Sequence, residues 1–343
     1  MMRFWNVSLL LVSVLLLAGS VKALLDYWQY DEMAADVAQL MLHQVSSEAV
    51  QQQVQEAIAN NNPADARMYL SLANTFGYNL DPAVFEAELQ RLESPLNTAR
   101  RTVNDFASGF LEGEASSGAG VAGALTADFT VVGDARDLWE QYQLYAKGEP
   151  VNELIVTLAG VGVGLTAATV ASAGTASAAK GGISTTKLAA RSGRLTPSFQ
   201  RFLLRQGSEV FDYKGFLLLA RAENNLDGIS KAALKAYNPQ ALRALKQTAE
   251  KVNTIRKSSS TADVVQVLKY VEQGEDLIRL EKISLKYGTQ TKGIMKLLGK
   301  SALGTIRVLR KTTELVLSII ASLVSFIVFL ISLSGMKIEK QSH

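Results

Sequence analysis

Runs of apolar residues interrupt an otherwise helical pattern of polar and apolar positions in this chain. Residues 315–336 form the longest strongly apolar run, with 22 uncharged positions that are mostly Ile, Leu, Val and Phe. Basic residues stand on both sides of the run. This length and apolarity are typical of a transmembrane helix, which needs about 20 apolar residues to cross a bilayer. We therefore predict a span in residues 313–336 and a short tail in residues 337–343.

The start of the chain carries a second apolar run, residues 4–21, which contains 18 uncharged residues. Val21-Lys22-Ala23 is an A-x-A-like sequence, which is typical of the cleavage site of a signal peptide. Aromatic residues at both ends of the run are instead typical of an uncleaved anchor. Residues 1–25 are thus predicted to be a signal anchor or a signal peptide, and the residues that follow them to be exported.

A third apolar run, residues 154–179, has no charge and is rich in Gly and Ala. Gly160 and Gly164 lie four positions apart, a spacing that lets two helices approach closely in lipid. We predict a transmembrane segment in residues 151–180, with these glycines against the last span or against another copy of the chain. The alternatives are a buried Gly/Ala-rich helix of a soluble domain and a flexible linker.

A fourth apolar run, residues 115–132, contains Asp128. A carboxylate near the centre of a membrane helix costs about 2.5–3.5 kcal/mol on insertion scales. We therefore predict that this run lies along the membrane without crossing it. Together with the amphipathic, aromatic-rich helix after it, the run makes up an interfacial segment in residues 115–148.

The rest of the chain shows helical spacing and helix-ending residues. Pro63 and Gly77 bracket one predicted helix, and Asn238-Pro239 separates two others. The pair of helices around residues 60–62 resembles a single tetratricopeptide-like αα-hairpin, a type of element that binds other proteins. The alternative is a small helical bundle that packs on itself. The predicted class is all-α: a multi-span helical membrane protein with an exported acidic helical region and a basic helical cytoplasmic region.

Charge is distributed unevenly along the chain. Residues 1–115 contain six Lys/Arg and fourteen Asp/Glu, whereas residues 181–312 contain 24 Lys/Arg and ten Asp/Glu. Lys and Arg favour the cytoplasmic side of a membrane. We therefore predict that residues 26–150 are periplasmic, that residues 181–312 are cytoplasmic, and that the chain is a multi-pass protein of a bacterial inner membrane.

Four charged residues lie close together between the apolar runs, in the stretch ADFTVVGDARDLWEQY: Asp128, Asp134, Arg136 and Asp137. Asp134 follows a glycine and precedes a helical pattern, so it is predicted to cap that helix. Asp137 then falls in the first turn, where an acid is favoured by the helix dipole. The alternative is that these acids bind a cation or the basic residues of a partner.

The same stretch, followed by Gly/Ala-rich sequence, resembles the hydrophobic pre-toxin segments of bacterial polymorphic toxins. The resemblance covers about residues 126–185. It implies association with a membrane. The chain departs from that family by its own export segment and by the lack of a recognisable toxin domain.

Signs of catalytic chemistry are missing. The chain has no Cys and only two His, which excludes His/Cys metal clusters and thiolate nucleophiles. Gly118, Gly120 and Gly123 match a dinucleotide motif by letter, but no strand pattern precedes them. The residues at 299–301 resemble the end of a phosphate-binding loop in a helical context. We therefore expect no enzyme activity and no catalytic, cofactor-binding or metal-binding residues.

The function that these patterns favour is that of an inner-membrane helical protein acting through protein–protein contacts, as a scaffold or in the envelope. The alternative is a pore-forming or membrane-perturbing toxin, because basic helices lead into the apolar C-terminal run. The expected partners are the lipid bilayer and other membrane or periplasmic proteins, with a homo-oligomer as a further alternative. Nucleic acid is disfavoured, because the basic residues are dispersed and form no known binding motif.

Overall fold

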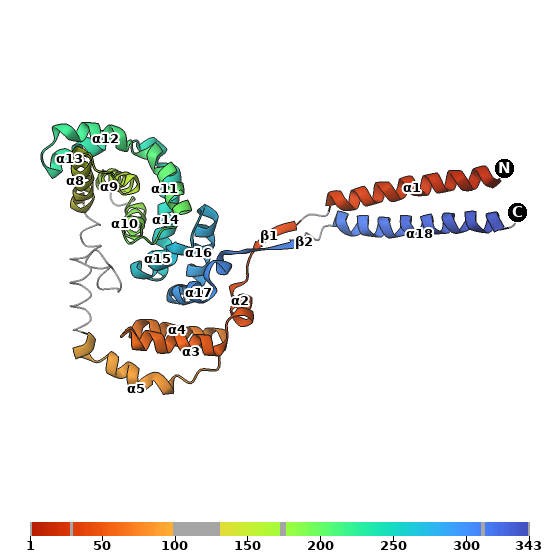
Figure 1. The fold of residues 1–343 in the computed structure, drawn as a ribbon, viewed down its shortest axis with the longest axis horizontal. Coiled ribbons are helices and arrows are strands. Elements are labelled where there is room, and N and C mark those ends of the chain that lie inside the picture. The colour runs from red at the N-terminus through yellow and green to blue at the C-terminus, as the bar shows by residue number, and fades with distance from the viewer. Residues whose placement is uncertain (1, 28–29, 99–130, 172–175, 310–312, 342–343) are drawn as a thin grey trace. The chain divides into compact units, whose positions relative to one another are not determined.

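A computed structural model describes residues 2–27, 30–98, 131–171, 176–309 and 313–341. The chain divides into two compact units (Figure 1): unit 1 consists of Met1–Ala35 and Thr305–His343, and unit 2 consists of Asp36–Gly304. Helices dominate both units, which confirms the predicted all-α class.

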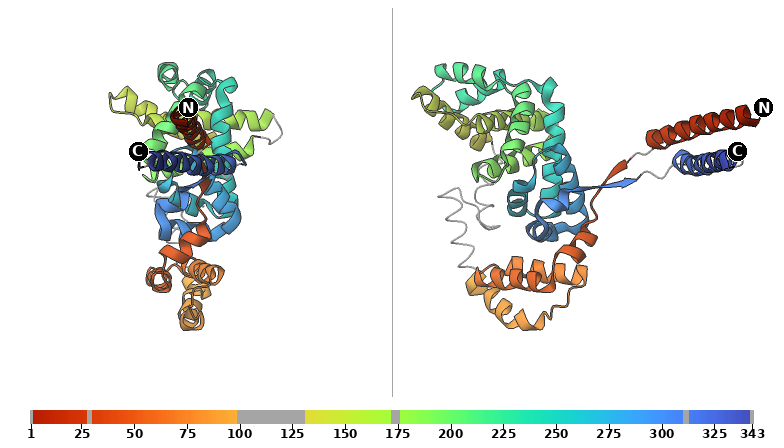
Figure 2. Two further views of the ribbon diagram at one scale, coloured as in Figure 1. Left: turned by 90° about the vertical axis from the view of Figure 1, so that its right-hand side faces the viewer. Right: turned by 45° about the vertical axis from the view of Figure 1, so that its right-hand side comes forward.

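Unit 1 is a hairpin of two long helices. The helices α1 (Met2–Tyr27) and α18 (Thr313–Gln341) pack along each other in opposite directions, so the two ends of the chain lie together (Figures 1 and 2). Next to them, β1 (Tyr30–Ala34) pairs antiparallel with β2 (Thr305–Leu309). Of the described helices, only α18 has a window long and apolar enough to cross a membrane, Glu314–Ile331.

The first part of unit 2, residues 36–98, is called the N-lobe here. Its helices are α2 (Val37–Gln44), α3 (Ser47–Ala59), α4 (Pro63–Phe76) and α5 (Ala83–Leu92). The Asn62 side chain caps α4 by accepting a hydrogen bond from the backbone N–H of Asp65, and Pro63 takes the first helical position. Gly77 ends α4 in the left-handed region, with φ 71°. These residues are the start and stop signals that the sequence predicts for this helix.

The second part of unit 2, residues 131–304, is called the C-lobe. Its longer helices are α8 (Val131–Ala146), α9 (Glu153–Ala171), α10 (Ser177–Arg191), α11 (Pro197–Val210), α12 (Tyr213–Leu219), α13 (Leu226–Lys235), α14 (Arg243–Ser258), α15 (Thr261–Val267), α16 (Gly274–Tyr287) and α17 (Thr291–Leu298). Short 3₁₀ turns join several of them: η1 (Ala220–Ala222), η2 (Pro239–Leu242), η3 (Leu268–Tyr270), η4 (Gly288–Gln290) and η5 (Gly299–Leu303).

One helix boundary differs from the sequence prediction. The apolar spacing after Thr261 predicts one long helix through Tyr287, but the structure has α15 and α16 with a break between them. Gln273 and Asp276 form a capping box that starts α16. This local capping supplies hydrogen bonds to a new helix start, which the apolar period does not reveal.

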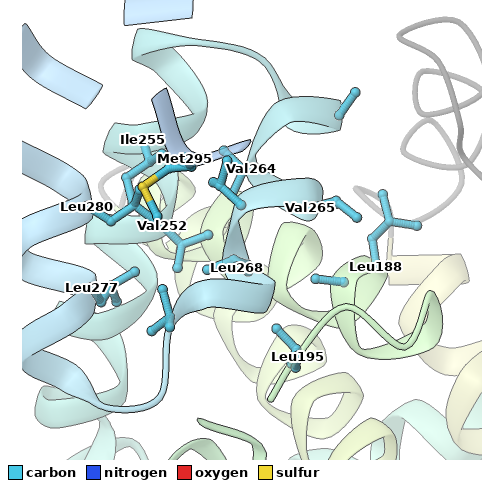
Figure 3. Close-up of a cluster of buried hydrophobic side chains, with 14 of the residues drawn as sticks. Leu188, Leu195, Val252, Ile255, Val264, Val265, Leu268, Leu277, Leu280 and Met295 are labelled. Carbon is cyan, nitrogen blue, oxygen red and sulfur yellow. The ribbon is translucent and has the colours of Figure 1, made fainter. Parts of the chain in front are cut away.

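Part of the core of the C-lobe joins α10 to the last helices of the unit. Figure 3 shows Leu188 of α10 in a cluster with Val252 of α14, Leu268, Leu280 of α16 and Met295 of α17. Burial of such side chains contributes about 25 cal/mol for each Å² of apolar surface removed from water. These contacts therefore hold α10 in a fixed position, which matters for the charged residues that α10 carries.

The apolar run at residues 154–179 lies largely in α9, inside the C-lobe. Every residue from 154 to 165 is buried, and α9 contacts α8, α10, α11, α12 and α13. A helix that is apolar on all faces needs a cover of either lipid or protein. In the structure neighbouring helices provide that cover. This arrangement corresponds to the alternative of a buried Gly/Ala-rich helix and differs from the predicted transmembrane segment at 151–180.

The N-lobe contacts the C-lobe through α4 and α17. Lys292 of α17 forms an ion pair with Asp65 of α4, and Gly293 packs against Met68. The two lobes therefore belong to one compact unit, whereas opposite compartments are predicted for residues 26–150 and 181–312. The uneven charge is instead balanced within unit 2, where residues 36–304 contain 28 Lys/Arg and 27 Asp/Glu.

Candidate functional site

Two helices of the C-lobe bring five charged side chains together, and we call this group the charge cluster. On α8, Asp134 and Asp137 are three positions apart and so lie on one face of the helix. On α10, Lys180, Lys187 and Arg191 are seven and four positions apart and also share a face. The packing of both helices against α9 turns these two faces toward each other.

The ion pairs of the charge cluster alternate between the two helices. Lys187 Nζ lies 2.6 Å from Asp134 Oδ1 and 2.6 Å from Asp137 Oδ2. Lys180 pairs with the other carboxylate oxygen of Asp134, and Arg191 pairs with Oδ1 of Asp137. Lys180 Nζ also donates a hydrogen bond to the backbone carbonyl of Gly162 at 3.2 Å. Lys187 therefore bridges the two acids, and each acid has a second cation of its own.

Burial makes these pairs energetically important. Asp134, Asp137, Lys180 and Lys187 are buried, whereas the side chain of Arg191 is 30% exposed. A buried charge is tolerated only when it is paired, because the desolvation cost of an isolated ion is several kcal/mol. Three cations face two carboxylates, and the solvent reached by Arg191 screens the additional positive charge.

Burial also acts on the protonation of Asp134. It raises the pKa of the Asp134 carboxyl above the ordinary value of an aspartate, while the positive charges of Lys187 and Lys180 act in the opposite direction. Burial thus favours the neutral form of the carboxyl, and the two lysines favour its charged form.

A glycine on α9 makes room for the charge cluster. A Cβ added at Gly162 would overlap with the carboxylate of Asp134. The missing side chain thus lets the acid of α8 reach past α9 to the lysines of α10. Gly162 is not among the glycines that the sequence pattern predicts to be contact positions.

The predicted packing glycines lie on the same helix. A Cβ at Gly160 would overlap with the ring of Phe211, and a Cβ at Gly164 would overlap with the ring of Tyr237. Both glycines therefore permit close contact with a neighbour. That neighbour is an aromatic ring of the C-lobe, and not the last span or another copy of the chain.

The structure gives the acids of the predicted capping site a different environment. The helix α8 begins at Val131, so Asp134 lies in its first turn, and its carboxylate bonds to lysines of α10. Asp137 also pairs with basic side chains. The alternative prediction is that these acids bind the basic residues of a partner, but the basic residues here belong to the same chain. Arg136 is exposed, and Asp128 lies outside the described residues.

Sequence reasoning missed the three basic residues of the charge cluster. A usable signal was present, because Lys180, Lys187 and Arg191 recur at helical spacing at the edge of a stretch dominated by Gly, Ala, Ser and Thr. Cations on one face of an otherwise small and apolar helix indicate a buried acidic partner. That signal does not say which acids in the chain are the partners.

The aromatic residues of α8, predicted to lie at a membrane interface, pack on the C-lobe. Leu138 is fully buried, and the rings of Trp139 and Tyr142 pack in a tilted arrangement with centroids 5.9 Å apart. Tyr142 and Tyr145 line a shallow surface hollow together with Arg221, whose guanidinium donates a hydrogen bond to the Tyr145 hydroxyl at 2.8 Å. The described part of segment 115–148 is therefore largely covered by protein.

The chemical role that this geometry supports is structural. Lysine and arginine side chains occupy the carboxylate oxygens that a cation would need, and both acids and both lysines are buried, so that only Arg191 is partly exposed. Within the described ranges, no group of three or more His, Cys, Asp or Glu is placed to hold a metal ion. The charge cluster therefore acts as a set of fixed ion pairs that join α8 to α10.

No family model, curated protein or solved structure matches this chain.

Proposed function

We propose that the chain is a membrane-anchored helical protein of a bacterial inner membrane, which acts through contacts with other proteins. Unit 1 supplies the anchor in this proposal. Its support is α18, in which Glu314–Ile331 has a mean hydropathy of 2.6 and only 11% of this window is buried by other parts of the chain. Apolar surface of that extent needs lipid or protein to cover it.

The closed charge cluster supports a non-catalytic role for the C-lobe. Catalytic groups have to reach a substrate, whereas Asp134, Asp137 and Lys187 are enclosed by α8, α9 and α10. Buried ion pairs of this kind are best attested as devices that fix which faces of two elements meet. In our proposal the C-lobe is a rigid support that presents the N-lobe.

The proposed protein contacts are supported by apolar side chains that are exposed on the N-lobe. Val84 is 71% exposed, and Leu42 and Leu96 are also exposed. Residues 36–98 contain eight Asp/Glu and only two Lys/Arg. Exposed apolar side chains within an acidic surface are suited to a basic protein partner, because charge steers the encounter and apolar contact adds affinity.

A photo-crosslinking amino acid at Val84 tests this proposal in cells that express the full chain. We expect a discrete adduct with one protein, and we expect its loss when Glu88, which is exposed one turn further along α5, is changed to Lys. A crosslinker at Leu234, an exposed residue of the C-lobe, is the matched control. An absent adduct, or an adduct indifferent to Glu88→Lys, would contradict the proposed contact.

The alternative of a pore-forming protein rests on a different observation, namely that α9 is apolar on all faces and would suit lipid if the C-lobe opened. Addition of the purified full chain to dye-loaded anionic vesicles separates the two functions. The scaffold role predicts no release of dye, and release at low protein-to-lipid ratios would favour the pore.

A further inference from the structure

The two helices of unit 1 meet along one regular line of residues. Among residues 314–331 of α18, the side chains that are not exposed are those of Leu315, Ser318, Ser322, Ser325 and Phe329. Among residues 11–25 of α1, they are those of Ser13, Leu17, Ser20, Ala23 and Leu24. Steps of three and four residues are the spacing of helices that wrap around each other with a left-handed twist. We call these two lines of residues the seam.

Serines make up much of the seam, and the hydroxyl bonds that are seen stay within the same helix. Ser13 is 1% exposed, and Ser318 is buried as well. Ser20 Oγ donates to the carbonyl of Leu17 at 3.0 Å, and Ser318 Oγ donates to the carbonyl of Leu315 at 2.8 Å. Such back-bonding satisfies a hydroxyl without water, and small side chains let two helices approach closely.

The outward faces of the hairpin are strongly apolar. Leu15 is 72% exposed, and Leu25, Leu317, Leu323 and Ile331 are exposed too. Two helices paired in water show the reverse order, with Leu and Ile in the seam and polar residues outside. An order with serine inside and leucine outside fits a hydrocarbon environment, where apolar side chains face the lipid and small or polar ones mediate helix contact.

The length of the apolar surface also fits a bilayer. The window Glu314–Ile331 has 18 residues. At about 1.5 Å per residue it extends roughly 27 Å, close to the hydrocarbon thickness of about 30 Å.

We infer that α1 and α18 cross the bilayer together as a hairpin held by the seam, with lipid acyl chains covering its outer faces. This inference rests on the membrane location proposed above. The chain leaves the hairpin at Tyr27 and re-enters it at Thr313. The described residues of unit 2, namely 36–98, 131–171 and 176–304, therefore lie on one side of the membrane, and the outer ends of α1 and α18 lie on the other. α1 is retained as the partner of α18, because cleavage after Ala23 would uncover Ser318 and the rest of the seam.

The chain contains no Cys, so single cysteines can report the side of the membrane directly. Four variants of the full chain serve: Gln52→Cys in α3, Lys235→Cys in α13, Met2→Cys and Ser342→Cys. In sealed vesicles, a membrane-impermeant maleimide should label Gln52→Cys and Lys235→Cys to the same extent. Met2→Cys and Ser342→Cys should lie on the other side of the membrane, so they should be protected where the first pair is labelled, or labelled where the first pair is protected. Opposite labelling of Gln52→Cys and Lys235→Cys would mean that α9 spans the membrane, and opposite labelling of Met2→Cys and Ser342→Cys would mean that only one helix crosses. Either result overturns the inference.

Paired cysteines test the seam itself. Ser20→Cys combined with Ser318→Cys, or with Ser322→Cys, should form a disulfide within one chain on mild oxidation. Leu15→Cys combined with Leu323→Cys, on outward faces at a similar depth, should not form one. Failure of both seam pairs overturns the hairpin. Dimers crosslinked through the outward pair would show that a second copy covers these faces, which overturns the assignment to lipid.

Extraction with alkaline carbonate separates the failure of this inference from the failure of the proposed function. Release of the full chain into the soluble fraction would refute the membrane anchor altogether. Retention in the membrane together with the wrong labelling pattern would refute only the hairpin.

Discussion

Lys187 Nζ lies 2.6 Å from Asp134 Oδ1, and both side chains are fully buried in the C-lobe. The pair joins α10 to α8 past the glycine face of α9. Two apolar side chains of similar volume could stabilise such a site equally well, so the ion pair is poor evidence for high stability. Its effect is on specificity, because any other register of α8 against α10 would leave a buried charge without a partner.

Removal of one partner of the charge cluster should destabilise the C-lobe. We expect Asp134→Asn to lower the free energy of unfolding by about 3–5 kcal/mol, because Lys180 and Lys187 lose a buried carboxylate. A capping role would make the same change nearly harmless, since Asn caps a helix as well as Asp does. Urea unfolding of the full chain in detergent micelles, followed by circular dichroism, measures the difference.

The matched control for Asp134 is Arg136, which is exposed on the same helix. Arg136→Gln should change the unfolding free energy by less than about 0.5 kcal/mol. A similar small effect for Asp134→Asn would show that the ion pairs of the cluster contribute little.

Local signals in the sequence predict many helix ends but not the partners of the charge cluster. Asn62 and Pro63 act on the residues that directly follow them, Gly77 acts on the end of the same helix, and the structure has α4 where they predict a helix. Asp134 and Lys187 are 53 positions apart, and their contact depends on how three helices pack. The sequence therefore indicates Asp134 as a candidate site residue but does not reveal that Lys187 is its partner.

The prediction for residues 154–179 illustrates a second limit. A helix apolar on every face has the same sequence whether lipid or protein covers it. What decides the matter is the covering surface, which for α9 comes from five other helices. Gly160 and Gly164 were recognised as contact positions, because small residues serve close packing in either setting.

Larger side chains on the glycine face of α9 should destabilise the C-lobe. A Cβ at Gly164 overlaps with the ring of Tyr237, and one at Gly160 overlaps with Phe211. Overpacking of this kind typically costs about 1–3 kcal/mol at each site, so Gly160→Leu and Gly164→Leu should each lower the urea midpoint. If α9 crossed a membrane instead, both substitutions should leave the stability nearly unchanged.

Ala167→Leu adds a larger side chain at an exposed position of the same helix and is the control for bulk. It should leave the midpoint nearly unchanged. Equal behaviour of Ala167→Leu and Gly164→Leu would argue against close packing around α9.

The titration of Tyr213 should depend on Glu153. The Tyr213 hydroxyl donates a hydrogen bond to Glu153 Oε1 at 2.6 Å, and this bond, followed by burial, raises the pKa of Tyr213 to about 12. The folded pKa is higher than the value of about 10 for an unfolded tyrosine. The contribution of this bond to stability is therefore complete below about pH 10, and it is lost as the pH rises through about 12.

Glu153→Gln should return the pKa of Tyr213 toward about 10, because the charged acceptor is gone. Ultraviolet absorbance of the phenolate, with the Tyr213→Phe variant subtracted, isolates this one residue. Titration of Tyr213 near 10 in the unchanged protein would contradict the hydrogen bond.

The attachment of the N-lobe should depend on Lys292 more than on its neighbour Lys296. Lys292 pairs with Asp65 of the N-lobe, lies 3.2 Å from Asp263 Oδ1, and has a side chain only 11% exposed. Lys292→Met would leave two carboxylates facing each other without a cation, at a cost of about 1.5–3 kcal/mol. Hydrogen exchange in α3 and α4 should accelerate while the C-lobe stays protected.

Lys296 is the matched control. It pairs with Glu56, and both side chains are 48% exposed, so Lys296→Met should cost less than about 1 kcal/mol and leave exchange in the N-lobe almost unchanged. Equal exchange rates in the two variants would show that apolar contacts, such as that of Gly293 with Met68, hold the N-lobe without help from Lys292.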